Sequence, residues 1–80
     1  MEIDLARHVA RAAFRSSREL RELLGLLKNH CSEEEYKGYA KAIATAIASI
    51  QLELVNRVTS DHPGLEDEIE AAIGKYDRYL

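Results

Sequence analysis

The sequence predicts an all-α fold: a three-helix up-down-up chain, made of a long helical hairpin and a shorter third helix, that pairs into a helical-bundle homodimer. Three observations predict this fold. Apolar residues recur with helical periodicity in three segments. One proline and four glycines are too few for the turns of an all-β domain. Both breaks between the segments carry helix-start signals. Eighty residues suit a single domain over residues 1–80.

The first helix is expected over residues 4–29, with Asp4 as a plausible N-cap. Its apolar side is formed by Leu5, Val9, Ala13, Leu20, Leu23, Leu24 and Leu27. Its opposite side is basic and is formed by Arg7, Arg11, Arg15, Arg18 and Arg21. The helix is therefore amphipathic and buries one side against the rest of the chain.

The second helix is expected over residues 33–59. The segment "SEEE" places Ser32 as N-cap and Glu35 three residues later, which is a capping box, and puts three carboxylates at the positive end of the helix dipole. Glu33 and Glu34 can also pair with Lys37 one turn on. A continuous apolar stripe follows along Tyr36, Tyr39, Ile43, Ile47, Ile50 and Leu54.

The third helix is expected over residues 63–79, after the break "SDHPG". Asp61 can cap this helix, and Pro63 suits its first turn. His62 is biased away from helix by the proline that follows it. Short turns make consecutive helices antiparallel neighbours. The apolar stripe of the third helix consists of Leu65, Ile69, Ala72, Ile73, Tyr76, Tyr79 and Leu80.

The segment "AIATAIASI" at residues 42–50 contains no charge, although almost a third of the chain is charged. On a helix it widens the apolar arc to roughly 200°, more than one neighbour requires. Small residues at Ala40, Ala44 and Ala48 let a further helix approach closely. We therefore expect this helix to be buried from more than one side.

The third helix is too short to cover the whole hairpin. It should span about 25 Å against about 40 Å for the first two helices, and should end near Ile43. The open end of the hairpin then predicts a homodimer interface, because leaving several leucines exposed forgoes roughly 1.5 to 3 kcal/mol each. The interface is expected at Leu20, Leu23, Leu24, Leu27, Tyr36, Tyr39 and Ile43. Two alternatives remain: another helical protein as partner, or a third helix that crosses obliquely and closes the hairpin alone.

The arginine side of the first helix suggests a second function, binding of an anionic ligand such as nucleic acid or acidic lipid. Its contacts would be Arg7, Arg11, Arg15 and Arg18. However, Glu19 and Glu22 stand four residues after two of these arginines, a spacing that pairs charges, and the formal net charge of the chain is −3. We therefore expect a solvated face, and neither nucleic acid nor membrane as a partner.

Catalytic and metal-binding patterns do not emerge from the sequence. His30 and Cys31 are adjacent at the first turn, but a tetrahedral metal site needs four ligands. Cys31 lacks an orienting acid, and the paired carboxylates lie at caps or on solvent faces, where nothing raises a pKa. We expect a protein that is not an enzyme and holds neither metal nor cofactor.

The tyrosines allow two interpretations. Tyr76 and Tyr79 should come to the height of Tyr39 and Ile43, where three phenols could rim a small pocket. More commonly, such tyrosines complete the edge of a core, with the ring buried and the hydroxyl in water.

Location and role follow from weaker signals. Cys31 is the single cysteine, which suggests a reducing compartment. The acidic start "MEIDLARHVA" does not resemble a signal peptide. The longest uncharged run, Ala42 to Leu52, would span about half a bilayer core. We expect a cytoplasmic protein whose role is protein–protein interaction or regulation.

Overall fold

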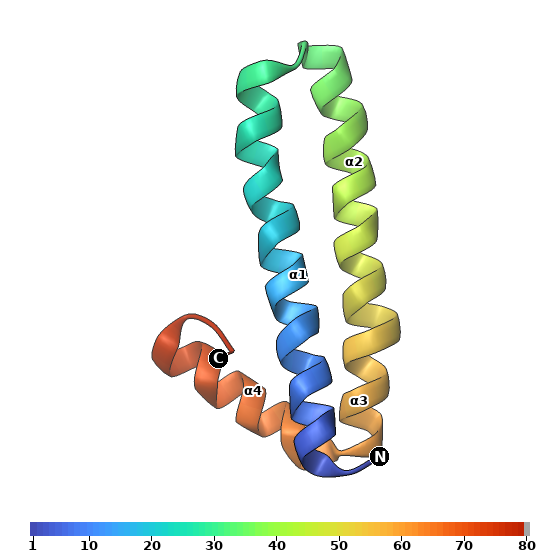
Figure 1. Ribbon diagram of the computed structural model, residues 1–80, viewed down its shortest axis with the longest axis vertical. Coiled ribbons are helices and arrows are strands. Elements are labelled where there is room, and N and C mark those ends of the chain that lie inside the picture. The colour runs from blue at the N-terminus through green and yellow to red at the C-terminus, as the bar shows by residue number, and fades with distance from the viewer. Residues whose placement is uncertain (80) are drawn as a thin grey trace.

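The computed structural model describes residues 1–79, which form an all-α chain without strands, as predicted. The long helix α1 (Ile3–His30) runs antiparallel to a continuous second helix composed of α2 (Glu33–Ser49), η1 (Ile50–Val55) and α3 (Asn56–Asp61). A short turn at the base leads into α4 (Pro63–Tyr76). Figure 1 shows that α4 leaves the hairpin obliquely and lies beside the lower part of α1.

The N-terminus of α1 is capped two residues earlier than expected. Glu2 is the N-cap, because its carboxylate accepts the backbone N–H of Asp4 at 3.1 Å. Asp4 therefore lies inside the first turn, where its negative charge favours the positive end of the helix dipole. The prediction of Asp4 as the cap was wrong, because the helix begins at Ile3 and the Glu2 side chain reaches the N–H group of Asp4 in its first turn.

The distal turn follows the sequence closely. The hydroxyl of Ser32 accepts the N–H of Glu35 at 3.1 Å, and the Glu35 carboxylate accepts the N–H of Ser32 at 3.2 Å. This capping box satisfies two backbone groups that the helix itself leaves without partners. Glu33 also pairs with Lys37 at 3.7 Å, one turn along the surface.

The second helix contains a π segment that the sequence did not reveal. In η1 the hydrogen bonds widen to i→i+5, so that the N–H of Asn56 donates to the carbonyl of Gln51. The wider turn shifts the phase of the apolar stripe by one residue. After Ile50 the next buried residue is Val55, five positions on, while Leu54 is 41% exposed. The prediction that Leu54 continues the core stripe was wrong for this reason.

The base of the hairpin differs from the prediction at both ends of α4. Asp61 is the last residue of α3 and does not cap α4. His62 takes that position without a side-chain hydrogen bond to the first turn of α4, at φ −134° and ψ 79°, and Pro63 follows as the first helical residue. The helix ends at Tyr76 and not at residue 79, because Asp77 adopts a left-handed conformation at φ 62°. The turn at Asp77 brings Tyr79 back against α1.

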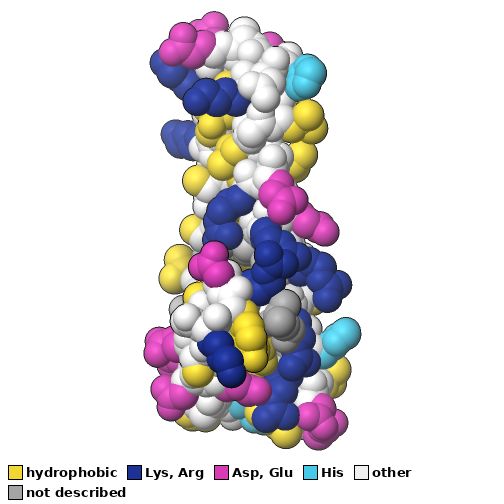
Figure 2. Space-filling model, turned by 90° about the vertical axis from the view of Figure 1, so that its left-hand side faces the viewer, with side chains coloured by type: hydrophobic (Ala, Val, Ile, Leu, Met, Phe, Trp, Pro, Cys, Tyr) yellow, Lys and Arg dark blue, Asp and Glu magenta, His cyan; other side chains and the backbone are white. Residues whose placement is uncertain are grey.

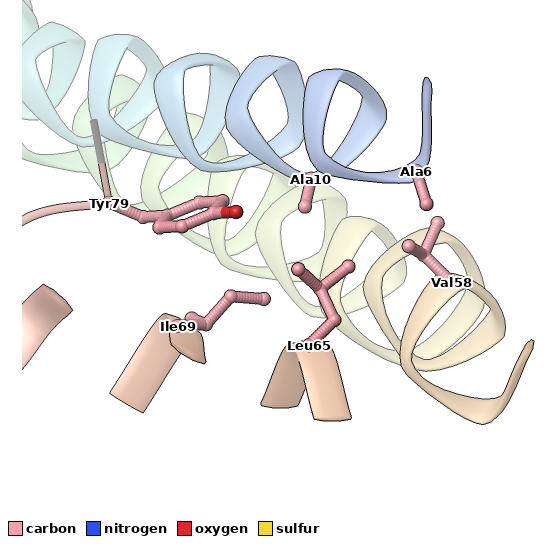
Figure 3. Packing of buried hydrophobic residues seen from close by; sticks show 6 residues of the cluster. All are labelled: Ala6, Ala10, Val58, Leu65, Ile69 and Tyr79. Atoms are coloured by element: carbon pink, nitrogen blue, oxygen red, sulfur yellow. The ribbon is translucent and has the colours of Figure 1, made fainter. Parts of the chain in front are cut away.

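The hydrophobic core lies at the base, where three segments meet. Figure 3 shows its central cluster, with α1 on one side, α4 on the other and α3 between them. Alanines on α1 let the neighbouring helices approach closely, and Leu65 of α4 is 1% exposed among them. Leu5, predicted to face the core, is 52% exposed, because the buried side of α1 is centred on Ala6 and Ala10 instead. The cluster consists of Ala6, Ala10, Val58, Leu65, Ile69 and Tyr79.

The described chain is elongated. Its principal extents are 45 × 24 × 16 Å and its radius of gyration is 14.7 Å, against about 12 Å for a compact domain of this length. As predicted, α4 covers part of the hairpin: Phe14 of α1 packs against the core cluster, and Gln51 of η1 lines a cavity together with Ile69 of α4. Within residues 1–79, no helix is both long and apolar enough to cross a membrane.

Candidate functional site

The seven residues predicted as an interface fall into two groups. Ile43 is buried, and four others are half-buried along the seam between α1 and α2, namely Leu20, Leu24, Leu27 and Tyr36. These five residues lie on the side of each helix that faces its neighbour. Leu23 and Tyr39 point away from the seam and are 41% and 54% exposed. The structure therefore separates the side chains that hold the hairpin together from those that a partner could cover.

Leu23 and Tyr39 belong to a longer apolar surface, which we name the open face. Helical phasing places Leu5 on the same stripe of α1 as Leu23, and Leu54 on the same side of the second helix as Tyr39, away from the side of α1 that α4 contacts. The residues between them are small and exposed: Ala12, Ser16, Ala42 and Ala46. Sequence reasoning missed Leu5 and Leu54 because it assigned both to the core.

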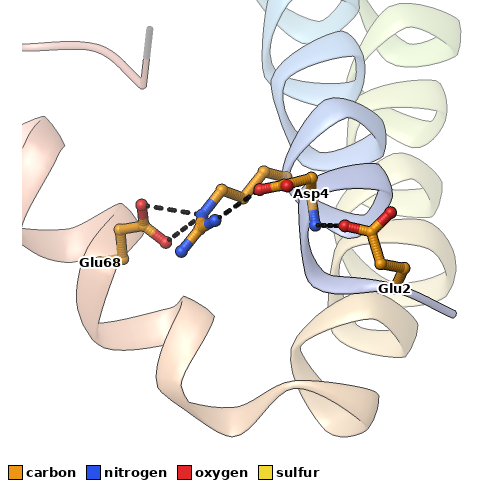
Figure 4. A network of polar contacts seen from close by, with 4 residues as sticks. Glu2, Asp4 and Glu68 are labelled. Atoms are coloured by element: carbon orange, nitrogen blue, oxygen red, sulfur yellow. Dashed lines mark hydrogen bonds and ion pairs between the residues drawn. The ribbon is translucent and has the colours of Figure 1, made fainter.

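The opposite side of α1 carries the arginines, and Arg7 is fully engaged there. Its Nε lies 3.1 Å from both carboxylate oxygens of Glu68 on α4, and its Nη1 lies 2.9 Å from Asp4 (Figure 4). The hydrogen bond and charge of Glu68 raise the pKa of Arg7, and burial opposes them. Arg7 therefore links α4 to α1, and its positive charge is balanced by the carboxylates of Asp4 and Glu68.

Arg11 also contributes to tertiary structure. Its guanidinium group lies over the ring of Tyr79, 5.3 Å from the centroid. The same ring meets Phe14 edge to face, with centroids 6.0 Å apart. These contacts fix the C-terminal turn on the arginine side of α1. Two of the four predicted anion-binding residues, Arg7 and Arg11, thus help to hold α4 and its C-terminal turn in place.

The remaining arginines do not form the intrahelical ion pairs that the spacing suggested. Among residues 1–79, the ion pairs within 4.0 Å join Arg7 to Asp4 and Glu68, and Lys37 to Glu33. The pairs Arg15–Glu19 and Arg18–Glu22 are not among them. Figure 2 shows dark-blue side chains gathered on this face beside the end of α4. Glu19 and Glu22 thus lie on α1 without a direct ion pair to Arg15 and Arg18.

These arginines line a cleft of about 450 Å³, which we name the arginine cleft. One wall is α1 and the other is the end of α4 with the turn that follows it. Arg78, which sequence reasoning did not connect with the stripe, comes from this turn. Its approach depends on the left-handed residue Asp77, which no sequence pattern marked. The described residues lining the cleft are Arg11, Phe14, Arg15, Arg18, Arg21, Ile73, Asp77, Arg78 and Tyr79.

The three tyrosines do not act together. Tyr79 is buried beside Phe14, and its hydroxyl has no hydrogen-bond partner among the described residues. Burial raises the pKa of Tyr79, and the charge of Glu68 adds to the effect, while Arg11 and Arg7 lower it. Tyr39 and Tyr76 are each more than half exposed and do not line the arginine cleft. Tyr79 alone completes a core edge, at the level of Phe14 and not of Tyr39.

His30, His62 and Cys31 lie apart from both surfaces. His30 and Cys31 are at the distal turn, and His62 is at the base, where its Nε2 lies 2.8 Å from the carbonyl oxygen of Met1. Within residues 1–79, no group of three or more His, Cys, Asp or Glu residues is placed to hold a metal ion. The open face and the arginine cleft are therefore the two surfaces with a distinct chemical character.

Comparisons of the chain with family models, with curated proteins and with solved structures found no match.

Proposed function

We propose that this protein is a small non-catalytic interaction module that acts as a homodimer, in which two hairpins pack their open faces together. The observation that carries the proposal is the one-sided covering of the hairpin. The fourth helix packs against one side of α1, and helical phasing puts the exposed residues Leu5, Leu23, Tyr39 and Leu54 on the other side of the hairpin.

The size of the open face suits a dimer. Two helices about 40 Å long, with a combined width of about 20 Å, offer about 800 Å². A standard protein interface buries about this area on each partner. Two such hairpins related by a two-fold axis would form a four-helix arrangement, in which the same patch meets itself.

The side chains of the open face also suit close packing between helices. Leu23 and Tyr39 lie in the distal half, and Leu5 and Leu54 lie near the base. The small side chains between them let backbones of two copies approach closely, while the large ones fill the space at either end. The residues in the seam, including Leu24 and Ile43, would hold α1 and α2 together beneath the interface without contacting the partner.

The proposal places the module in the cytoplasm, supported by the single cysteine, which is half-buried and near the distal turn. In this role the dimer presents two arginine clefts, one on the outer side of each hairpin. The proposed mechanism is burial of the apolar open face by a second copy.

The solution mass measured by light scattering tests this proposal. At micromolar concentration the mass should be twice 9.0 kDa and should not change with salt, because the interface is apolar. Leu23→Glu should produce monomers, since a carboxylate would be buried in the interface. Leu23 already lies outside the seam, so the hairpin of this variant should remain helical by circular dichroism.

Leu52→Glu is the matched control. Leu52 is exposed and lies about half a turn away from Leu54 on the same helix, outside the open face. This variant should remain a dimer. A monomeric wild-type protein would overturn the homodimer and favour another helical protein as partner. Dissociation by Leu52→Glu but not by Leu23→Glu would show that the open face is not the interface.

A further inference from the structure

We propose that the arginine cleft binds a small molecule that carries two linked phosphoryl groups. The cleft is concave, it is lined by arginines from two segments far apart in sequence, and it lies on the side of α1 away from the open face. Its volume of about 450 Å³ falls in the range of small-ligand sites, about 300 to 1,000 Å³.

The charges in the cleft favour a ligand with more than one phosphoryl group. Arg15, Arg18 and Arg21 approach from α1 and Arg78 approaches from the turn after α4, and among the described residues that line the cleft Asp77 carries the one carboxylate. Each guanidinium group presents a fork that can engage two oxygens of a phosphate. One phosphoryl group offers three terminal oxygens and about two negative charges, fewer than four such forks can engage. Two linked groups match the arginines more closely.

The spacing along α1 fits the same ligand. Arg15, Arg18 and Arg21 are separated by three residues each, so their Cα atoms span about 9 Å along the helix axis. Long side chains from that span can converge on a compact diphosphate. Phe14, Ile73 and Tyr79 form an apolar wall beside them, against which the organic part of a ligand can pack.

An extended polyanion fits this surface less well. The stripe does not continue toward the base, because Arg7 is already paired with Glu68 and Asp4. Beyond it the first turns of α4 expose Glu66, Asp67 and Glu70, which repel a phosphate backbone. The formal net charge of −3 acts in the same direction. A short polyanion confined to the cleft avoids these carboxylates.

Titration calorimetry with pyrophosphate and with a nucleoside diphosphate tests the proposal on the full chain. Both should bind saturably with one site per chain, and inorganic phosphate should bind more weakly. Tighter binding of the nucleoside diphosphate would assign the apolar wall to the organic part. Equal affinity would assign recognition to the diphosphate alone, and both results support the site.

Variants at the cleft give the decisive comparison. Arg18→Gln and Arg78→Gln should each weaken pyrophosphate binding by about tenfold to a hundredfold, the usual loss when a charge-assisted hydrogen bond is removed. Arg57→Gln is the matched control: it removes one exposed arginine from α3, outside the cleft, and should leave the affinity unchanged. Asp77→Asn should tighten binding severalfold, because it removes the repelling charge and asparagine tolerates the left-handed conformation.

Three results would overturn the proposal. The first is no saturable binding of either diphosphate at millimolar concentration. The second is an equal loss of affinity in Arg57→Gln and Arg18→Gln, which would indicate attraction by overall charge. The third is tight binding of a single-stranded oligonucleotide that pyrophosphate does not displace. None of these results depends on the oligomeric state, so they are separate from the test of the homodimer.

Discussion

The two halves of the hairpin are held together by different means. In the basal half, α4 and Tyr79 pack against α1 and α3 around Leu65, which is almost fully buried. In the distal arm, residues 18–49, only two helices meet. Nine of the ten buried residues among residues 1–79 lie in the basal half, and Ile43 is the one in the arm. The base therefore carries a core of its own, whereas the arm depends on a seam.

This difference shows that burial is distributed unevenly along the hairpin. Most stability of helices in proteins comes from tertiary packing of an apolar side and not from helix propensity. The basal half obtains such packing within the chain. The distal arm has its capping box and its seam, and the apolar surface that it leaves exposed is available to a partner.

The largest expected effect is a difference in unfolding free energy between the two halves, and a pair of leucine truncations measures it. Leu65→Ala removes a side chain that is 1% exposed and should lower the free energy of unfolding by about 2–5 kcal/mol. Leu26→Ala removes a side chain of the arm that is 56% exposed and should change it by no more than about 0.5 kcal/mol. Urea denaturation at matched protein concentration measures both. Equal losses would mean that the arm carries a buried core of its own.

A smaller effect should appear at alkaline pH and should come from the base alone. The pKa of Tyr79 is raised by burial above its usual value of about 10, so the folded state disfavours the phenolate. The unfolded chain ionises this phenol first as the pH rises. The stability that Tyr79 contributes is therefore fully present below about pH 10 and is lost as the pH rises through the folded-state pKa.

Tyr79→Phe removes this ionisation. At neutral pH the variant should be as stable as the wild type or more stable by up to about 1 kcal/mol, because the hydroxyl is buried without a partner among the described residues. Between neutral pH and about pH 11 its denaturation midpoint should fall less steeply than that of the wild type. The same change at the exposed Tyr39 of the arm should leave the slope unaltered. Parallel curves for Tyr79→Phe and wild type would show that this phenol is not linked to folding.

The smallest effect should come from deleting Leu52. The deletion turns the five-residue spacing from Ile50 to Val55 into an ordinary helical spacing of four, so Val55 and Val58 keep facing the core. We expect the free energy of unfolding to change by no more than about 1 kcal/mol, the size of a typical point-mutation effect.

Deleting the exposed residue Ala12 from α1 is the matched control. That helix has no π segment between Ala10 and Ala13, so the deletion turns one half of the buried side away from the core and should cause severe loss of stability. Thermal denaturation followed by circular dichroism compares the two deletions. A severe loss in both would show that the π segment cannot absorb a missing residue.

The features that the sequence predicted are those set by local patterns. The three helices, the capping box at Ser32 and the break at Pro63 each depend on a few neighbouring residues. The capping of α1 by Glu2 and the end of α4 at Asp77 were missed, because both depend on conformations that residues of several types can adopt. The phase shift in η1 was missed because a periodicity argument assumes one helical repeat throughout.

The two surfaces were predictable to different degrees. The apolar character of Leu23 and Tyr39 and the arginine stripe of α1 follow from helical phasing. Their outlines do not, because these depend on which side of the hairpin α4 occupies. Leu5 is exposed on the open face, and Arg78 lines the arginine cleft, because α4 packs on one particular side of the hairpin. The position of α4 is a feature of the tertiary structure that no local pattern contains.

The π segment divides the second helix into two rods that share an axis and differ in rotational setting. In a regular α-helix a lost residue turns everything beyond it by about 100°. The π segment already holds one residue more than an ordinary turn, so the loss of one residue there restores the regular spacing and leaves both rods facing α1. The exposed turn therefore acts as a reserve of one residue, and the length of the second helix can change at this point without turning the arm relative to the core.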